Sequence, residues 1–333
     1  MKKIKKMIIS TLLVLLFLIM INTVIIEASN QKDQIRIGYF PNITHAPALV
    51  GISENIFADN LNGTEIKTMI FPNGSLFMDA LNTGQIDIGY VGPGPAMNRY
   101  LQGADVKALA SASTGGTVMV SNKNFNYSSE QDLKNKIIAT PALGCTHDLV
   151  FRQFIKDHNL NTRRHGGSID HRAQNPATMV GLFATNQIDA AVVSEPWAAR
   201  METELDSNVI LEWDAVPWNG KLPATIIVSS NEYIEKNQDL VAQFLKAHLR
   251  AINFIAENPE QSSKIIQSEI ENITGQNLSI EVIDRSLART NMTAELDASI
   301  LQELADLSSE LGFINNDSDL EGFVDLHYLN LIK

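Results

Sequence analysis

Two stretches of this chain share one pattern, and that repetition constrains its fold more than any other feature. Residues 84–96 read GQIDIGYVGPGPA, and residues 186–198 read NQIDAAVVSEPWA. In each stretch a Gln-Ile-Asp triplet precedes a short apolar run, and a turn that contains proline follows. An apolar run bounded by turn residues is typical of a strand buried on both faces, as in a parallel sheet. Open α/β sheets bind their ligands at the carboxyl ends of such strands.

A second pair of stretches has the same spacing. Residue numbers 84 and 186 differ by 102, and so do 35 and 137. At this spacing residues 35–40 match residues 137–142, and Thr44-His45 matches Thr146-His147. Two matches at one spacing predict two similar α/β lobes in series. Ordinary similarity of composition among α/β units is the alternative interpretation.

The sequence between these stretches predicts alternating strands and helices. In the first half we expect strands at 35–39, at 65–71, near 86 and at 106–111, with helices at 46–57, 75–83 and 96–102. The second half repeats the pattern, with helices at 147–159 and 177–185. Its strands are expected at 137–140, just before the second of these helices, near 188, at 209–213 and at 223–230. We therefore expect an α/β fold in which each lobe is a mainly parallel sheet flanked by helices.

Length and pattern together divide the chain. At 333 residues it suits two lobes better than one core. We assign residues 33–117 to the first part of lobe 1, residues 118–222 to lobe 2, and residues 223–333 to a return to lobe 1 and a C-terminal helical part. The helices predicted at 240–257, 262–271, 280–288 and 298–311 are expected to brace the two lobes together.

Residues 1–29 have the pattern of a signal peptide or a membrane anchor. Four lysines within the first six residues precede the almost wholly apolar residues 7–26. This order is typical of a secretory leader, but an apolar stretch of about 20 residues is also long enough to span a bilayer. In both cases we expect the rest of the chain outside the cytoplasm, in the periplasm or on the outer face of the cell membrane.

Charge and cysteine content exclude several classes of function. The net charge of −12 argues against binding of nucleic acid or anionic lipid. It leaves room for a small anion, because helix N-termini can bind one locally. Cys145 is the only cysteine, so neither an internal disulfide nor a multi-cysteine zinc site can form.

Three motifs carry a family resemblance. Residues 37–48 (IGYFPNITHAPA), 84–96 and 189–198 (DAAVVSEPWA) look like the extracytoplasmic solute-binding proteins of ATP-driven importers for aliphatic sulfonates, taurine and nitrate, and so does the closing DLHYL at 325–329. The resemblance implies a two-lobed fold of the periplasmic-binding-protein type II class. It also implies a ligand cleft between the lobes and delivery of the ligand to the transmembrane subunits of an ABC permease.

The candidate ligand contacts lie where predicted strands end. Backbone N–H groups at glycine turns and helix N-termini bind an anionic head group at little cost of reorganisation. In the loop after residue 91, glycines remove side chains and prolines hold the chain rigid. The predicted ligand-binding residues are Asn42, Thr44, His45, Gly92, Pro93, Gly94, Ser113, Thr114, Gly144, Cys145, Thr146, His147, Glu195 and Trp197.

Several of these residues have a second interpretation. A carboxylate repels a sulfonate, so Glu195 either braces the hinge or pairs with the ammonium group of a taurine-like zwitterion. Trp197 either lines the cleft against an alkyl chain or packs in the core. Cys145 with His147 could serve an exported enzyme, since Cys145 precedes a predicted helix. Catalysis would also need an orienting base and an oxyanion site, and His147 alone does not meet that need.

We expect a monomeric binding protein, not an enzyme, with no cofactor and no metal ion. Its ligand is expected to be a small organic anion, first of all an aliphatic sulfonate, captured by closure of the lobes. Nitrate, taurine and a thiamine-precursor pyrimidine remain alternative ligands. No nucleic acid is expected as a partner.

Overall fold

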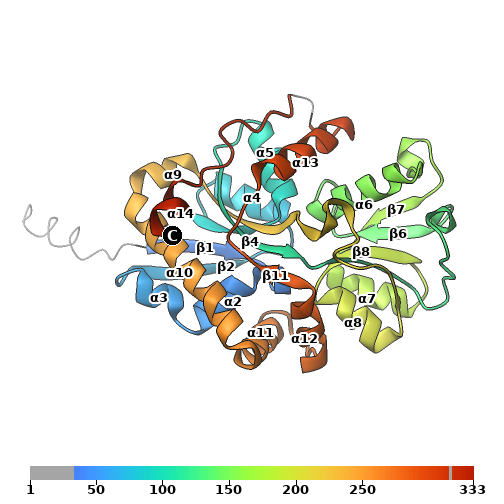
Figure 1. The fold of residues 1–333 in the computed structure, drawn as a ribbon, viewed down its shortest axis with the longest axis horizontal. Coiled ribbons are helices and arrows are strands. Elements are labelled where there is room, and N and C mark those ends of the chain that lie inside the picture. The colour runs from blue at the N-terminus through green and yellow to red at the C-terminus, as the bar shows by residue number, and fades with distance from the viewer. Residues whose placement is uncertain (1–33, 315–316) are drawn as a thin grey trace, which may run out of the picture.

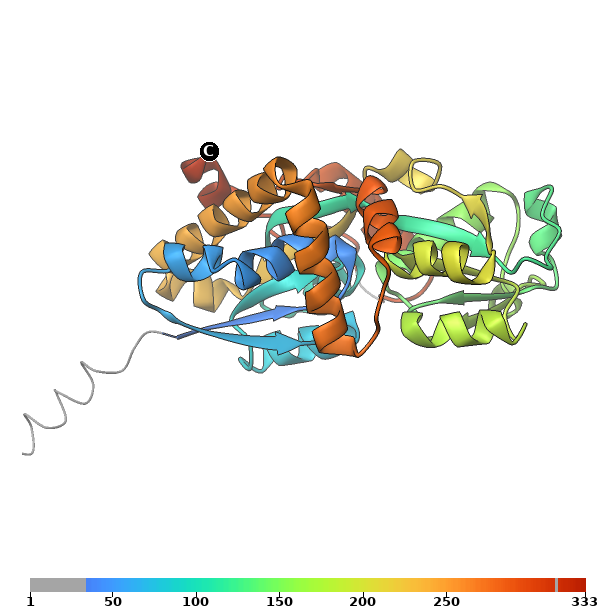
Figure 2. The ribbon, with the colours of Figure 1, turned by 90° about the horizontal axis from the view of Figure 1, so that it is seen from below.

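A computed structural model describes residues 34–314 and 317–333. These residues form two lobes side by side, each built around one β-sheet with helices packed on it (Figures 1 and 2). The predicted leader, residues 1–29, lies outside the described residues. Within them, no helix combines the length and the apolar character that a membrane crossing requires. The predicted α/β architecture with two lobes is confirmed.

The first lobe contains the larger sheet, in which β1 pairs in parallel with both β2 and β3. On the other side of β3 lies β10, which is antiparallel to both β3 and β4. In order across the sheet, the strands are β11 (Thr290–Met292), β4 (Lys107–Gly115), β10 (Pro223–Ser229), β3 (Ile88–Val91), β1 (Gln34–Tyr39) and β2 (Glu65–Ile70).

The second lobe repeats this topology. Strand β6 pairs in parallel with β7 and with the central strand β8, and β8 pairs antiparallel with β5. In both lobes the antiparallel neighbour (β10 or β5) is the first strand after the chain crosses from the other lobe. In order across the sheet, the strands are β7 (Asp170–Ala173), β6 (Ile137–Thr140), β8 (Ala190–Ser194), β5 (Thr117–Ser121) and β9 (Asn208–Leu211).

Amphipathic helices cover both sheets, and their apolar faces supply most of the core. The helices of the first half are α2 (Ala46–Ser53), α3 (Ile56–Asn60), α4 (Gly74–Asn82) and α5 (Pro93–Leu101). Those around the second sheet are α6 (Thr146–Asp157), α7 (Pro176–Ala184) and α8 (Trp197–Leu205). The remaining helices are α9 (Asn231–Lys236), α10 (Gln238–Glu257), α11 (Pro259–Thr274), α12 (Ile280–Ala288), α13 (Ala298–Glu310) and α14 (His327–Ile332).

Two of the C-terminal helices contact both lobes. Helix α12 contacts β11 of the first lobe and α8 of the second, and α13 contacts both α5 and α6 (Figure 1). The chain after residue 229 therefore holds the lobes together, as the helical pattern of this region predicts.

The short 3-10 helices are η1 (Ile43–His45), η2 (Glu130–Leu133), η3 (Arg163–His165) and η4 (Pro217–Gly220).

Three details differ from the sequence-based expectations. The single helix predicted at 46–57 is two helices, α2 and α3, because Asn55 adopts a left-handed conformation with φ 58°. The proline-rich stretch after Gly92 is not a loop, since Pro93 begins α5, where its missing N–H costs no hydrogen bond. Strands β5 and β11 were not predicted.

The spacing of 102 residues holds for β3 and β8 but not for the strands beside them. Ile88 pairs with Ile37, and Ala190, 102 residues beyond Ile88, pairs with Ile138. The residue numbers 37 and 138 differ by 101, so the predicted match of residues 35–40 to residues 137–142 was wrong by one residue. The helices that follow begin at Ala46 and Thr146, 100 residues apart, so Thr44-His45 and Thr146-His147 do not occupy equivalent positions before them.

Candidate ligand-binding site

A cavity of about 360 Å³ lies between the lobes at the carboxyl ends of the central strands. Most of its wall is apolar. The first lobe contributes Phe40, Pro41, Asn42, Thr44, His45, Ile70, Phe71, Pro72, Asn73, Gly74, Gly92 and Pro95, with Ala224, Ile273 and Thr274 from later in the chain. The second lobe contributes Pro141, Ala142, Cys145, Thr146, His147, Asn175, Pro176, Ala177, Ser194 and Trp197.

The predicted ligand-binding residues divide into two groups. Those that line the cavity are Asn42, Thr44, His45, Gly92, Cys145, Thr146, His147 and Trp197. Those that do not line it are Pro93, Gly94, Ser113, Thr114, Gly144 and Glu195. Of the second group, Gly94 and Ser113 form hydrogen bonds with residues of the first.

A chain of hydroxyl groups holds the loop after β1. Thr225 Oγ1 donates to Thr44 Oγ1 at 2.9 Å, and Thr44 Oγ1 donates to Asn42 Oδ1 at 2.8 Å. Ser113 Oγ, fully buried, donates to the carbonyl oxygen of Thr44 at 2.8 Å. Ser113 therefore fixes the rim of the cavity from behind. Thr114 lies further along β4, where its hydroxyl accepts from Asn291 Nδ2 at 3.4 Å.

His45 presents a hydrogen-bond donor without a charge. The backbone N–H of Phe40 donates to His45 Nδ1 at 3.3 Å, so the neutral ring carries its proton on Nε2. The two rings stack, with centroids 4.7 Å apart. Burial lowers the pKa of His45 to about 3, and burial lowers the pKa of His147 to about 4. Both imidazoles are therefore neutral at pH 7.

A buried ion pair supports the loop of the second lobe that lines the cavity. The N–H of Gly144 donates to Asp148 Oδ2 at 2.7 Å, and Arg152 Nε donates to Asp148 Oδ1 at 3.0 Å. The other guanidinium nitrogens of Arg152 lie 3.0 Å from His165 Nδ1 and 3.0 Å from His171 Nδ1. This network fixes residues 144–147 at the start of α6.

The thiol of Cys145 is not poised as a nucleophile. Burial, with the nearby charge of Asp148 adding to it, raises the pKa of Cys145 to about 12, and three backbone N–H groups offset this only in part. A thiolate is the reactive form, so at neutral pH almost none is present. The raised pKa disfavours the thiolate that the exported-enzyme interpretation of Cys145 and His147 requires.

Gly92 and Gly94 allow the two lobes to approach closely. A Cβ atom on Gly94 would lie 2.9 Å from the backbone nitrogen of Thr146, and one on Gly92 would lie 2.8 Å from Thr146 Oγ1. The N–H of Gly94 donates to Thr146 Oγ1 at 3.2 Å. Asn98 Nδ2 donates to the carbonyl oxygen of Gly144 at 3.2 Å, a second contact between the lobes. Gly94 therefore contacts the opposite lobe.

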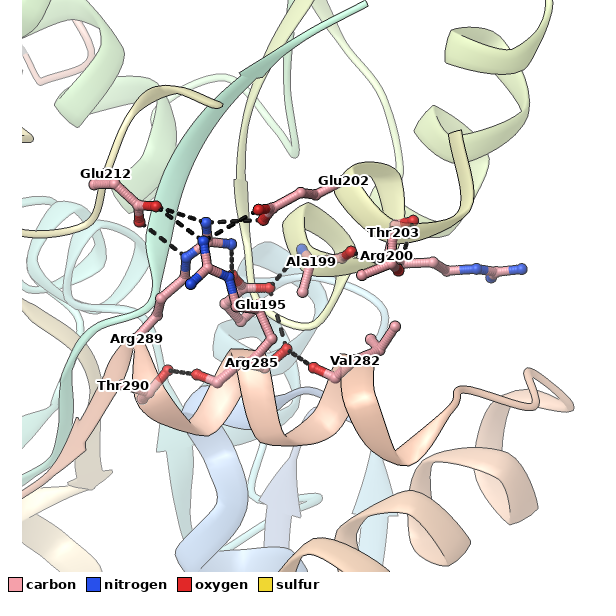
Figure 3. Close-up of polar contacts among 11 residues, drawn as sticks. Glu195, Ala199, Arg200, Glu202, Thr203, Glu212, Val282, Arg285, Arg289 and Thr290 are labelled. Atoms are coloured by element: carbon pink, nitrogen blue, oxygen red, sulfur yellow. Dashed lines mark hydrogen bonds and ion pairs between the residues drawn. The ribbon is translucent and has the colours of Figure 1, made fainter. Parts of the chain in front are cut away.

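Glu195 lies behind the cavity wall and takes part in an ion-pair cluster. Its side chain is fully buried, and its Oε1 accepts from Arg289 NH1 at 2.9 Å (Figure 3). Burial raises the pKa of Glu195, although the N–H of Ala199 and the charge of Arg289 act in the opposite direction. Of the two roles proposed for Glu195, the contacts fit the hinge brace. Trp197, two residues further on, is 5% exposed and lines the cavity.

Sequence reasoning missed Asn73 and Asn175, although the spacing of 102 residues relates them. Each caps a helix: Asn73 Oδ1 accepts from Leu76 N at 3.0 Å, and Asn175 Oδ1 accepts from Ala177 N at 3.0 Å. Both line the cavity. The corrected spacing of 101 likewise relates Phe40 to Pro141, which also line it. Comparing the two halves at both spacings could have found these residues.

The cavity combines helix N-termini with an absence of charged side chains. The N-cap residues of η1, α2, α4, α5, α6 and α7 all line it. Among the described residues, none of those lining it is Asp, Glu, Lys or Arg. The partial positive charge of helix N-termini favours an anionic group. Within residues 34–314 and 317–333, no three His, Cys, Asp or Glu side chains group to hold a metal ion.

The fold is two-lobed, and the cavity described above lies between the lobes. The chain belongs to the NMT1-like family, which matches residues 28–269. The taurine-binding periplasmic protein of Escherichia coli (strain K12) is 24% identical over 215 residues, covering 64% of each chain.

Two solved structures have the same fold. The alkanesulfonate-binding protein from Xanthomonas axonopodis pv. citri, bound to MOPS, matches with a TM-score of 0.74 at 22% identity, over 88% of this chain and 98% of that one. The periplasmic nitrate-binding protein from Synechocystis PCC 6803 matches with a TM-score of 0.76 at 15% identity, over 91% of this chain and 88% of that one. The resemblance drawn from the motifs is confirmed, and so is the predicted fold of the periplasmic-binding-protein class.

Proposed function

We propose that this protein is the substrate-binding component of an ABC importer, and that it captures a small organic anion, an aliphatic sulfonate, between its lobes. Family membership, the fold and the named functions of similar proteins support this proposal. In this role the protein acts outside the cytoplasm, as a monomer, and delivers its ligand to the transmembrane subunits of a permease. It makes and breaks no bond, in keeping with the raised pKa of the Cys145 thiol.

The observation that carries the proposal is the uncharged cavity with helix N-termini around it. A sulfonate group accepts hydrogen bonds from backbone N–H groups and from neutral donors such as the His45 Nε2–H. The side chains of Ile70, Phe71 and Trp197 provide apolar surface for an alkyl chain. A nitrate ion would leave most of a cavity of about 360 Å³ unfilled.

The same cavity disfavours an ammonium group. Among the described residues no carboxylate lines it, and Glu195, the nearest one in sequence to Trp197, is engaged by Arg289. A buried ammonium without a counter-charge is costly. Taurine and propane-1-sulfonate have the same number of heavy atoms and differ only in whether an ammonium or a methyl group ends the chain. We therefore expect propane-1-sulfonate to bind at least tenfold more tightly than taurine.

Isothermal titration of the exported part of the chain with both ligands tests the proposal. Butan-1-ol, which has an alkyl chain but no sulfonate, is the matched negative control. Measurable binding of propane-1-sulfonate, with weaker taurine binding and no binding of the alcohol, is the expected result. Equal binding of taurine would contradict the argument from charge, and no binding of any sulfonate would contradict the assigned ligand class.

A thiamine-precursor pyrimidine is the second candidate, and the aromatic wall favours it. The rings of Phe40, Phe71 and Trp197 line the cavity. A flat heteroaromatic ligand could stack on such rings and receive hydrogen bonds from Asn and His side chains. Adding 4-amino-5-hydroxymethyl-2-methylpyrimidine to the titration separates the two candidates, because a neutral pyrimidine and an alkanesulfonate share no head group.

A further inference from the structure

Glu195 connects parts of the molecule that surround the cavity. Its backbone N–H donates to the carbonyl oxygen of Gly116 at 2.9 Å, and its own carbonyl oxygen accepts from Ile43 N at 3.3 Å. Gly116 lies where the chain crosses between the lobes, and Ile43 lies in the loop that carries Asn42 and Thr44. Glu195 itself follows Ser194 and precedes Trp197, both of which line the cavity.

The carboxylate of Glu195 fixes two further elements. Its Oε2 accepts from the N–H of Ala199 at 2.9 Å, in the first turn of α8 (Figure 3). The same oxygen accepts from Ser286 Oγ at 3.2 Å, in α12. Its Oε1 accepts from Arg289 NH1 at 2.9 Å. A carboxylate at a helix N-terminus is favourably placed, but one with no exposed surface needs a partner of opposite charge.

Arg289, which follows the last residue of α12, is that partner. Its side chain is 2% exposed, and its backbone carbonyl oxygen accepts from Gly116 N at 2.7 Å. Its guanidinium also contacts Glu202, at 2.8 Å, and Glu212, at 2.8 and 2.9 Å (Figure 3). Burial lowers the pKa of Arg289, but the hydrogen bonds and charges of the three glutamates outweigh burial and raise it. The guanidinium of Arg289 thus forms ion pairs with three carboxylates, those of Glu195, Glu202 and Glu212.

We propose that Arg289 is a positioning residue of the ligand site: it holds Glu195 in place, and Glu195 in turn orients Trp197 on one side of the cavity and the loop at residues 42–45 on the other. Arg289 does not line the cavity. This inference rests on the proposed ligand-binding function. Without the guanidinium, Glu195 would be a buried charge with no cation, so it would take up a proton or move. In either case its hold on the cavity wall weakens.

Arg285 is a matched control on the same helix. It contacts Glu202 at 3.1 Å and Glu212 at 3.3 Å, as Arg289 does, but its side chain is 44% exposed, and within the described residues its ion pairs are with these two glutamates and not with Glu195 (Figure 3). Replacing either arginine by methionine removes one cation and leaves an uncharged side chain of similar shape along its first carbons. Only Arg289→Met removes the cation from Glu195. The difference between the two variants therefore isolates the contact on which the inference depends.

The test measures affinity for propane-1-sulfonate by titration calorimetry, and backbone hydrogen exchange without ligand. We expect Arg289→Met to weaken binding at least tenfold and Arg285→Met to change it less than threefold. Exchange should rise in residues 41–46 and 194–201 of Arg289→Met but stay unchanged in helix α10. Arg289→Lys keeps a cation but loses the forked geometry of the guanidinium, so its affinity for the ligand should lie between those of the two methionine variants.

The inference is overturned if Arg289→Met binds as tightly as the parent protein, if its exchange in those two segments is unchanged, or if exchange rises equally in α10. Should Arg289→Met fail to fold, the double variant with Glu195→Gln removes the unpaired charge and is measured in its place, with the same expectations. If the parent protein binds no sulfonate, the proposed ligand class fails. The exchange measurement, which needs no ligand, still decides the role of Arg289.

Discussion

Asp87 and Asp189 have the same structural role in the two lobes. Asp87 Oδ2 accepts from the N–H of Arg36 at 2.7 Å, and Asp189 Oδ2 accepts from the N–H of Ile137 at 2.8 Å. The N–H of each aspartate donates to the carbonyl oxygen of the same partner residue, at 2.9 and 2.8 Å. The repeated Gln-Ile-Asp triplet therefore ties the start of β3 to β1, and the start of β8 to β6.

Removing these carboxylates should destabilise the protein unequally. Asp87 is 6% exposed and forms an ion pair with Arg36, whereas Asp189 is partly exposed and its ion pair with Lys136 is longer, at 3.6 Å. A hydrogen bond to a charged group contributes about 1.5–3 kcal/mol, so we expect Asp87→Ala to lower the free energy of unfolding by about that amount. Asp189→Ala should lower the free energy of unfolding by about half as much. Urea unfolding measures both, and an equal loss for the two variants would contradict this reasoning.

Local sequence patterns such as this triplet explain why much of the fold could be predicted from the sequence. The strands around residues 35, 88, 137 and 190 are short apolar runs, and the long helices α10 to α13 have apolar residues at helical spacing, so local pattern decides both. Strand β11 has only three residues and owes its extended conformation to pairing with β4. Nothing in its local sequence signals that pairing. A proline such as Pro93 is equally compatible with a turn and with the first position of a helix, so the start of α5 could not be predicted either.

The candidate site could be predicted in part, for a similar reason. Residues 42–45 and 144–147 follow predicted strands, and a parallel sheet brings such loops together. The pairing of Glu195 with Arg289 joins residues 94 positions apart. The sequence offers several arginines as partners, and only the packing of α12 against α8 selects this one. Glu195 and Gly94 were predicted to contact ligand because sequence cannot separate the residues of a cavity wall from those directly behind it.

Gly115 should tolerate substitution less well than a glycine of similar backbone conformation elsewhere. Gly115 has φ 74°, and a Cβ atom there would lie 2.7 Å from the carbonyl oxygen of Arg289 and 2.8 Å from the ring of Trp213. Gly63 has φ 84°, and a Cβ atom there would meet nothing within 4 Å. Gly63→Ala should therefore cost only the left-handed strain of about 1–2 kcal/mol.

Gly115→Ala should cost that strain and a steric clash of about 1–3 kcal/mol in addition. Since Gly115 ends the strand from which the chain crosses to the second lobe, the same variant should also weaken ligand binding. Chemical unfolding and calorimetric titration of both variants measure these effects. Similar losses of stability in Gly63→Ala and Gly115→Ala would show that the clash is relieved at no cost.

The single thiol should react slowly in the folded protein. With burial raising the pKa of Cys145 to about 12, the thiolate fraction at pH 8 is far below that of a free thiol. We expect iodoacetamide to label Cys145 at least tenfold more slowly than it labels the same protein in denaturant. Cys145→Ser should keep ligand affinity within about threefold. Fast labelling of the folded protein, or a large loss of affinity in the serine variant, would reopen a chemical role for this residue.

Stability should fall as the pH drops from 6.5 to 5, because four histidines have lowered pKa values and stay neutral in the folded protein. Burial lowers the pKa of His45 to about 3, and burial is also the largest cause of the pKa values of about 4 at His147, His171 and His248. An unfolded histidine has a pKa of about 6.5. Below that pH the unfolded chain binds protons that the folded chain does not, so acid favours unfolding.

His248 offers the clearest single test of this pH dependence. Its Nε2 lies 3.0 Å from the carbonyl oxygen of Ser111, and its Nδ1 lies 3.1 Å from the hydroxyl of Tyr90, so the neutral ring donates from Nε2 and accepts at Nδ1. Each buried histidine adds up to about 1.4 kcal/mol per pH unit to the slope of unfolding free energy against pH. Replacing His248 by Gln should lower stability at pH 7 and reduce that slope by about one proton. Urea unfolding at pH 5.0, 5.5, 6.0 and 6.5 gives both slopes, and an unchanged slope in the variant would mean that His248 takes up its proton in the folded protein.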